Sequence, residues 1–168
     1  NLGPAGLTLV LINKDFLKNF HNNKSIPAIW DYRSHTSKLF NTPPTLAIYM
    51  TEVVLKWLED DIGGLKNMAE INRKKAALIY NYIDSDNFYT PYAAENSRSL
   101  MNVVFNLNCD KAEAVEQLFI QEAEKQGMIG LKGHRSLGGI RASIYNAVDM
   151  ESVEILVEFM KEFSKKMG

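Results

Sequence analysis

The chain has 168 residues, with 19 Lys and Arg against 20 Asp and Glu, and a formal net charge of -1 at pH 7. That length is enough for one domain, or for one small domain plus part of another. The near-neutral charge excludes a global field that would attract nucleic acid or an anionic membrane, so recognition of anions has to be local. Cys109 is the single cysteine, which excludes a disulfide framework and fits a reducing compartment; we expect it to be a partly buried structural thiol.

The first residues predict a buried strand. GPAG at residues 3–6 leads into LTLVLI at residues 7–12, a pattern typical of a turn before a strand that is buried on both faces of a parallel sheet. The neighbouring strands would have to come from elsewhere. Because the chain also starts without Met or a signal-peptide pattern, we expect it to be a fragment of a longer protein. Its longest apolar run is far shorter than the roughly 20 residues that cross a bilayer.

A long helix is predicted to follow an irregular connection over residues 13–38. Thr42 is a suitable N-cap and Pro43 suits the first helical position, so a helix should cover residues 46–58. Because that stretch is mostly apolar, we expect it to be well buried. Gly63 and Gly64 should end it.

A second helix is predicted from the spacing of one apolar face. Its basic triplet Arg73, Lys74 and Lys75 is read as a solvated face rather than a nucleic-acid contact. Residues 84–97 are rich in turn formers, which is typical of a crossing between domains. The predicted face of the helix comprises Leu65, Met68, Ala69, Asn72, Ala76, Ile79, Tyr80 and Ile83.

The remaining residues predict a small α/β unit in the order strand, helix, strand, strand, helix. Strands are expected over residues 101–107, 128–131 and 140–145, with Arg141, Ser143 and Tyr145 on one face of the last. Asp110 with Glu113 should open the first helix as a capping box, and Gly127 should end it. The final helix is expected to be capped by Asp149 and to bury Val153, Leu156, Val157, Met160 and Phe163. The predicted domains are residues 1–64, 65–96 and 97–168.

Residues 132–147 carry the pattern that is most informative about chemistry. Lys132, His134 and Arg135 stand close together, and Arg141 follows six residues after Arg135. Because the arginine fork matches phosphate and carboxylate, two separated arginines indicate two separated anionic groups. The alternative is that Arg135 pairs with a surface acid and His134 binds a backbone carbonyl.

A second possible anion site lies at Asn41 and Thr42, before the predicted long helix, where free backbone N–H groups gather. The alternative there is a plainly capped helix. The three histidines, His21, His35 and His134, have no acidic or cysteine partners at metal-ligand spacing, so no metal site is expected. No nucleophile elbow, P-loop or dinucleotide fingerprint occurs.

Five motifs together resemble the phosphoserine aminotransferase family: NLGPAG at residues 1–6, FNTPPT at 40–45, SRSLMNV at 97–103, KGHR at 132–135 and GGIRASIYNA at 138–147. The resemblance implies an α/β protein of the aspartate-aminotransferase type (fold type I), dependent on pyridoxal 5'-phosphate, cytoplasmic and homodimeric. This chain would be the end of the large domain plus the small C-terminal α/β domain, without partners among nucleic acids or membranes.

The resemblance also implies roles for five residues. Asn41 and Thr42 would hold the cofactor phosphate of the neighbouring subunit, His134 and Arg135 the substrate phosphate, and Arg141 the substrate α-carboxylate. The cofactor-binding lysine would stand immediately before Asn1, so no catalytic residue is expected in this chain and it should be inactive alone. The implied reaction moves an amino group between glutamate and 3-phosphohydroxypyruvate. Two alternatives are a related pyridoxal-phosphate aminotransferase with another substrate and a non-catalytic module that binds phosphorylated acids.

Overall fold

The computed structural model describes residues 1–19, 26–36 and 38–168, which form two compact units. Unit 1 consists of Leu58–Gly168 together with Asn1, and unit 2 of Leu2–Trp57. His21, one of the three histidines that lack metal-ligand spacing, lies outside the described residues. The predicted domains 1–64, 65–96 and 97–168 stay a prediction for the longer protein.

The strand predicted over residues 7–12 is wrong for this structure. These residues have no regular secondary structure, and Leu11 is 92% exposed. A strand needs hydrogen-bonding neighbours, and the described residues of unit 2 supply none. The predicted irregular connection instead holds α1 (Lys14–Lys18) and the 3-10 turns η1 (Ala28–Trp30) and η2 (Tyr32–His35). Asn13 caps α1, because its side-chain oxygen accepts the N–H of Asp15 at 2.8 Å.

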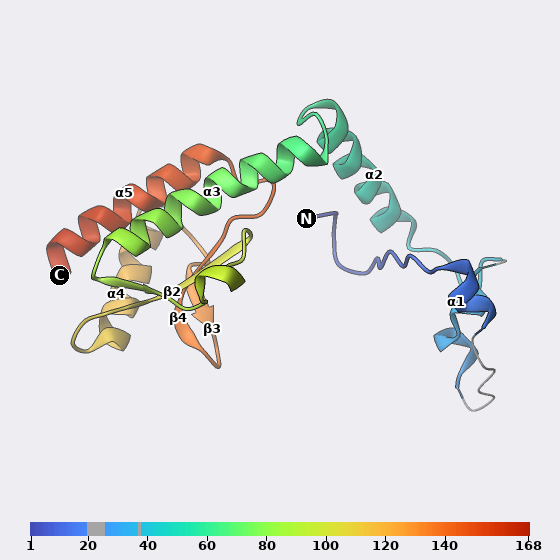
Figure 1. The fold of residues 1–168 in the computed structure, drawn as a ribbon, viewed down its shortest axis with the longest axis horizontal. Helices are drawn as coiled ribbons and strands as arrows, with labels where there is room; N and C mark the ends of the chain where they lie inside the picture. Colours follow the sequence, from blue (N-terminus) through green and yellow to red (C-terminus); the bar gives the residue numbers. More distant parts are fainter. Residues whose placement is uncertain (20–25, 37) are drawn as a thin grey trace. The chain divides into compact units, whose positions relative to one another are not determined.

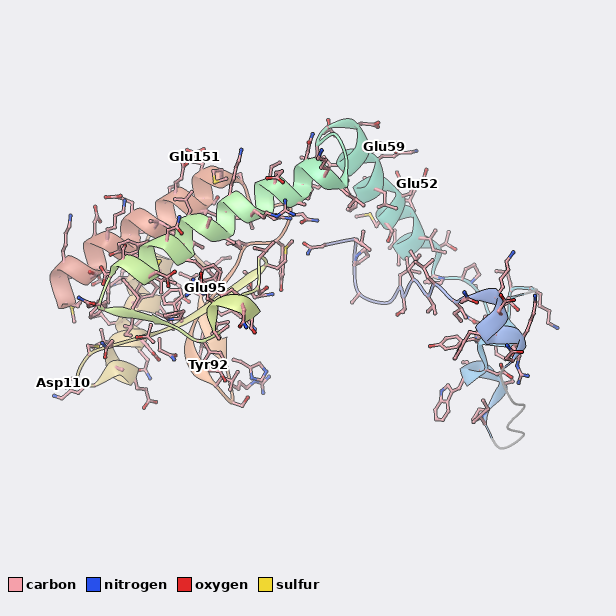
Figure 2. All side chains as sticks on the ribbon, viewed as in Figure 1. Glu52, Glu59, Tyr92, Glu95, Asp110 and Glu151 are labelled. Atoms are coloured by element: carbon pink, nitrogen blue, oxygen red, sulfur yellow. The ribbon has the colours of Figure 1, made fainter. Side chains whose placement is uncertain are left out.

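Helix α2 (Thr45–Asp60) confirms the predicted long helix but not its burial. Ala47 and Thr51 are buried, whereas Leu46 is 73% and Tyr49 58% exposed. The helix is apolar around most of its circumference, and the described residues of unit 2 cover only one face of it. Its polar positions include Glu52, which pairs with Lys56 at 2.8 Å, and Glu59 (Figure 2).

The end of α2 matches the prediction, while its start differs. Gly63 and Gly64 have φ of 80° and 93°, and the N–H of Gly64 donates to the Leu58 carbonyl at 2.8 Å. This left-handed ending favours glycine. At the other end, the carbonyl of Pro44 accepts the first intrahelical bond, from Ile48 at 3.0 Å. Thr42 is therefore not the N-cap that the sequence predicted.

Unit 1 is a four-stranded antiparallel sheet with helices packed on one face. Its strands are β1 (Tyr89–Pro91), β2 (Asn102–Leu107), β3 (Lys132–His134) and β4 (Gly138–Ser143), in the order β1-β2-β4-β3. Helices α3 (Leu65–Ser85) and α5 (Met150–Met167) lie side by side over the sheet (Figure 1), and α4 (Ala112–Lys125) also packs against it. The core forms where Phe105 of β2 and Ile140 of β4, both fully buried, meet the three long helices. Cys109 is half-buried against this core as expected, and burial raises the pKa of its thiol. A 3-10 turn, η3 (Glu95–Ser97), lies between β1 and β2.

Most of the predicted elements of unit 1 are confirmed, including the Asp149 cap, whose carboxylate accepts the N–H of Ser152 at 2.7 Å. Two predictions about where its helices and strands begin are wrong. Lys111, with φ of 57°, occupies the N-cap position of α4, and no side chain caps that helix, so Asp110 does not form a capping box. Residues 128–131 are not a strand, because Gly127 and Gly130 have positive φ and interrupt extended backbone. The strand there is β3, which starts at Lys132.

The basic triplet of α3 is only partly solvated. Arg73 and Lys74 are exposed, as predicted, but Lys75 is completely buried, which corrects that prediction. Lys75 lies one turn from the buried Asn72 and beside the buried Ala76. Its ammonium group donates to backbone carbonyls, which compensates part of the cost of burying a charge.

An ion pair between Arg98 and Asp84 links the segment before β2 to the end of α3. The guanidinium donates two bonds of 2.6 Å to the carboxylate and stacks over the Tyr80 ring, 4.7 Å from its centroid. These bonds hold the pKa of Asp84 below its usual value of 3.8. A carboxyl with a lowered folded-state pKa stabilises the protein above the unfolded-state value and loses that contribution as the pH falls through the folded-state value.

We therefore expect Asp84→Asn to destabilise the chain near neutral pH and to have less effect in acid. Because Asp84 is about half exposed, the loss should not exceed about 1 kcal/mol. Urea unfolding at pH 7 and well below pH 3.8 measures it. Glu70→Gln, which breaks the exposed pair with Arg73, is the control and should change less. An Asp84→Asn chain with the pH dependence of the unaltered chain would contradict the prediction.

Candidate functional site

The open face of the unit 1 sheet carries the polar residues of β2 and β4. In the antiparallel register Arg141 stands opposite Val104, and Ser143 opposite Asn102. Because side chains alternate along a strand, Arg141 and Ser143 lie half-buried on this face, while Ile140 and Ala142 enter the core on the other. This alternation confirms that Arg141 is held in a defined direction by the sheet.

Arg141 has a guanidinium group with an unused buried donor. Its Nε atom is buried and has no hydrogen-bond partner, and no ion pair joins Arg141 to any residue that the structure describes. Leaving a buried donor unpaired costs about 1–3 kcal/mol, and a carboxylate that binds the guanidinium would remove that cost. The surroundings of Arg141 therefore fit an anionic ligand.

His134 and Arg135 lie at the turn of the same hairpin, between β3 and β4. His134 is paired with Gly138 in the register, and its carbonyl accepts the N–H of Leu137 at 3.1 Å. Its ring Nδ1 lies 2.8 Å from the Ser136 hydroxyl and accepts the Ser136 N–H at 3.3 Å. In a neutral ring this leaves the proton on Nε2, where it can be donated to a ligand.

The alternative interpretation of this turn receives no support. His134 bonds to Ser136 rather than to a backbone carbonyl, and Arg135 is exposed and forms no ion pair with a described residue.

The hairpin also contains a close approach of the backbone at Gly139, which has φ of 71°. A Cβ there would lie 2.3 Å from Asn106 Oδ1 and 3.0 Å from the Phe105 carbonyl oxygen, and the positive φ itself favours glycine. The hairpin thus presents His134 and Arg135 at its turn and Arg141 further along β4.

Asn102 also lies on this face, and its hydrogen bonds to Ser143 and Tyr145 could not be predicted from the sequence. Its Oδ1 accepts hydrogen bonds from the Ser143 hydroxyl at 3.1 Å and from the Tyr145 hydroxyl at 3.3 Å. Alternation along residues 101–107 predicts the face of Asn102, but only the register of β2 against β4 brings the three groups together. These bonds orient Ser143 and Tyr145 along the strand that carries Arg141.

Asn41 and Thr42 lie in unit 2, both exposed, just before α2. The Asn41 amide donates to the Thr42 carbonyl at 3.0 Å, and Thr45 N–H donates to the Pro43 carbonyl at 2.8 Å. Because α2 begins three residues after Thr42, the interpretation of Thr42 as a plain helix cap is wrong. The exposed amide and hydroxyl groups beside the first turn of a 16-residue helix are suitable donors for a phosphate.

The described residues hold neither a metal-binding cluster nor a membrane-spanning helix. No group of three His, Cys, Asp or Glu side chains there is placed to hold a metal ion. No helix in the described part of the chain has the length and apolar character needed to cross a membrane.

Residues 1–156 match the family model for class-V aminotransferases. The chain belongs to the class-V aminotransferase family. Phosphoserine aminotransferase of Desulfosudis oleivorans is 48% identical over 170 residues, which cover 100% of this chain and 46% of that protein. The structure of phosphoserine aminotransferase from Bacillus circulans subsp. alkalophilus has a TM-score of 0.90 and 45% identity, covering 100% of this chain and 46% of that one. The structure of PLP-bound phosphoserine aminotransferase from Trichomonas vaginalis has a TM-score of 0.81 and 37% identity over 89% of this chain and 42% of that one.

These likenesses confirm the predicted family and fold class. The chain has an α/β fold of the aspartate-aminotransferase type, as does the corresponding part of those enzymes. It spans about half the length of the relatives that it matches.

Proposed function

We propose that the chain is the C-terminal part of a phosphoserine aminotransferase. The complete protein would transfer an amino group between glutamate and 3-phosphohydroxypyruvate, giving phosphoserine and 2-oxoglutarate, in serine biosynthesis. The observation that carries this proposal is the β3–β4 hairpin, which presents Arg141 at one place and His134 with Arg135 at another, none of them paired with a described acidic residue. Relatives at 48% identity bear the same name.

Each anionic group of the proposed substrate would have a partner on the hairpin. Arg141 would bind the α-carboxylate, because a guanidinium fork forms two parallel bonds to a carboxylate. Arg135 and the Nε2–H of His134 would bind the phosphate, which carries more charge and accepts bonds from several directions. The two arginines would thus hold both ends of one small acid. This chain would supply recognition of the substrate, and the proton transfers would be carried out by residues outside it.

Pyridoxal 5'-phosphate is the cofactor that we propose, and it would supply an electron sink when bound. The donors at Asn41 and Thr42 fit its phosphate group, as described above. We propose that they serve the site of the neighbouring subunit in a homodimer. The exposed apolar side chains of α2, such as Leu46 and Tyr49, support a further protein surface against this helix. We place the protein in the cytoplasm, which the unpaired Cys109 supports.

Removal of the proposed phosphate contacts tests the substrate class. In the complete protein, His134→Ala combined with Arg135→Ala should lower kcat/KM for phosphoserine about 100-fold or more, because two charge-assisted bonds contribute about 1.5–3 kcal/mol each. The half-reaction with glutamate, which has no phosphate, should change only a few-fold. Stopped-flow absorbance of the two half-reactions measures both values.

The control for this experiment is Arg73→Ala, an exposed arginine of α3 that lies outside the hairpin. It should leave both half-reactions unchanged. An equal loss with phosphoserine and with glutamate would contradict the phosphate role and favour a related aminotransferase with another substrate. An active double variant with unaltered phosphoserine kinetics would contradict the assignment of the turn altogether.

A further inference from the structure

The side-chain amide of Asn102 is held in one orientation by two hydroxyl groups. Its Oδ1 atom accepts from the Ser143 hydroxyl at 3.1 Å and from the Tyr145 hydroxyl at 3.3 Å. Because both bonds are made to the oxygen, they fix which side of the amide faces the hydroxyls. The two N–H groups of Nδ2 therefore lie on the opposite side of the amide, in a defined direction.

These two N–H groups are free to bind a ligand. No residue in the described part of the chain accepts a hydrogen bond from Asn102 Nδ2. Unlike the Nε of Arg141, this atom is not fully buried, so a ligand can reach it. The backbones of β2 and β4 are already paired at Asn102 and Ser143, so the side-chain bonds are not needed to join the strands.

Asn102 and Arg141 are diagonal neighbours on the open face of the sheet. In the register of β2 against β4, Asn102 stands opposite Ser143, and Arg141 stands opposite Val104. The Cα atoms of diagonal neighbours are about 7–8 Å apart, a distance that a long side chain such as arginine spans. Neither strand contains an acidic residue. Both sets of donors can therefore meet on one ligand.

A carboxylate is the ligand group that matches this pair of side chains. Its two oxygens offer about four acceptor sites, and a guanidinium fork uses two of them. An amide N–H next to the fork can donate to a third site. Because the Asn102 amide is oriented before a ligand arrives, less rotamer freedom is lost when the bond forms.

We propose that Asn102 is a second carboxylate-binding residue, whose Nδ2 donates to the carboxylate that Arg141 binds, and that Ser143 and Tyr145 are positioning residues for its amide. The inference rests on the proposed function, in which Arg141 binds the α-carboxylate of the substrate. It adds a neutral donor to that site, so the preference for an acid would depend on a charged group and on an oriented amide together.

The test measures ligand binding by calorimetry to the complete protein with pyridoxal phosphate bound. One probe is 3-phosphoglycerate. The other is glycerol 3-phosphate, which has the same three-carbon chain and phosphate but a hydroxymethyl group in place of the carboxylate. Neither probe has an amino group, so neither can donate one to the cofactor.

Asn102→Asp is the main variant, because it keeps an oxygen for both hydroxyls and replaces only Nδ2. Its affinity for 3-phosphoglycerate should fall at least about tenfold, as expected for the loss of a hydrogen bond to a charged group. Its affinity for glycerol 3-phosphate should change less than about twofold. Asn102→Ala, which adds no charge, should still lower the affinity for 3-phosphoglycerate about fivefold or more, the effect of one ordinary hydrogen bond.

The hydroxyl groups are tested by Ser143→Ala combined with Tyr145→Phe, which decides the outcome if neither Asn102 variant folds. Without orientation of the amide, the affinity for 3-phosphoglycerate should fall about threefold or more, with glycerol 3-phosphate unchanged. The matched control is Asn108→Asp, because Asn108 is exposed just beyond the far end of β2. That position is about 20 Å from Asn102 along the strand, well beyond the screening length, so neither affinity should change.

Three results would overturn the inference. Equal losses with both probes would show that the Asn102 amide only maintains the sheet. An unaltered affinity for 3-phosphoglycerate in Asn102→Ala would show that its donors do not reach the carboxylate. An unaltered affinity in the variant without the two hydroxyls would refute their positioning role. An unaltered complete protein that binds both probes equally would instead refute the carboxylate role of Arg141 and the proposed function, whereas variants that keep its preference for 3-phosphoglycerate would refute this inference alone.

Discussion

Arg141→Ala in the complete protein is expected to lower kcat/KM for phosphoserine between about 150-fold and about 4,000-fold. The physical reason is the loss of a partly buried cation from a site that, as we propose, binds the substrate carboxylate. Removing one member of such a pair costs about 3–5 kcal/mol, most of it from the anion that is left without a partner. This cost applies to Arg141 because the Nε atom of its guanidinium is buried and has no hydrogen-bond partner.

The conservative change separates charge from geometry. Arg141→Lys should recover only part of the loss, because lysine keeps a point charge but not the planar fork that binds a carboxylate with two bonds. Arg73→Ala, on the exposed side of α3, serves as the control for removal of an arginine. Steady-state kinetics with phosphoserine and 2-oxoglutarate measure all three variants. A wild-type rate in Arg141→Ala would refute the role assigned to this residue.

Phe119→Ala is expected to destabilise this chain by about 3–5 kcal/mol, the largest effect on stability that we predict. The Phe119 ring is fully buried and lies at the centre of the aromatic core of unit 1. Its centroid is 4.9 Å from that of Phe159 and 5.0 Å from that of Phe163, with Phe105 at 6.2 Å. Truncation leaves a cavity and removes edge-to-face contacts that α4 makes with both α5 and the sheet.

Urea unfolding followed by far-UV circular dichroism measures this loss. Both tryptophans, Trp30 and Trp57, lie in unit 2, so their fluorescence would report on the wrong unit. Ile155→Ala is the control, because Ile155 is on α5 in the same unit and is 50% exposed. It should cost less than about 1 kcal/mol. A Phe119→Ala chain as stable as Ile155→Ala would contradict the description of this core.

Local patterns were sufficient for those elements of unit 1 that are amphipathic or whose hydrogen-bonding partners are near in sequence. Most of the face of α3, the Asp149 cap of α5 and the alternation around Arg141 follow from periods of 3.6 and 2 residues and from short-range hydrogen bonds. On α3 the prediction was wrong for Leu65, which is exposed, and for Lys75, which is buried. The same reasoning failed at residues 7–12, where the backbone hydrogen bonds of a strand have to come from other segments. It failed also for the burial of α2, because an apolar surface is buried only if something covers it.

The sequence alone was sufficient for the family, since this depends on residue identity and spacing. It also supplied the prediction of two separate anion-binding places, which stays a prediction. The tertiary structure was required for the partners of each group. Long-range packing brings Lys75 to the carbonyls of residues 144–149, links Asn102 to Ser143 and Tyr145, and leaves the Nε of Arg141 unpaired. Such contacts join positions tens of residues apart. They arise from strand register and helix packing, which no local pattern in the chain specifies.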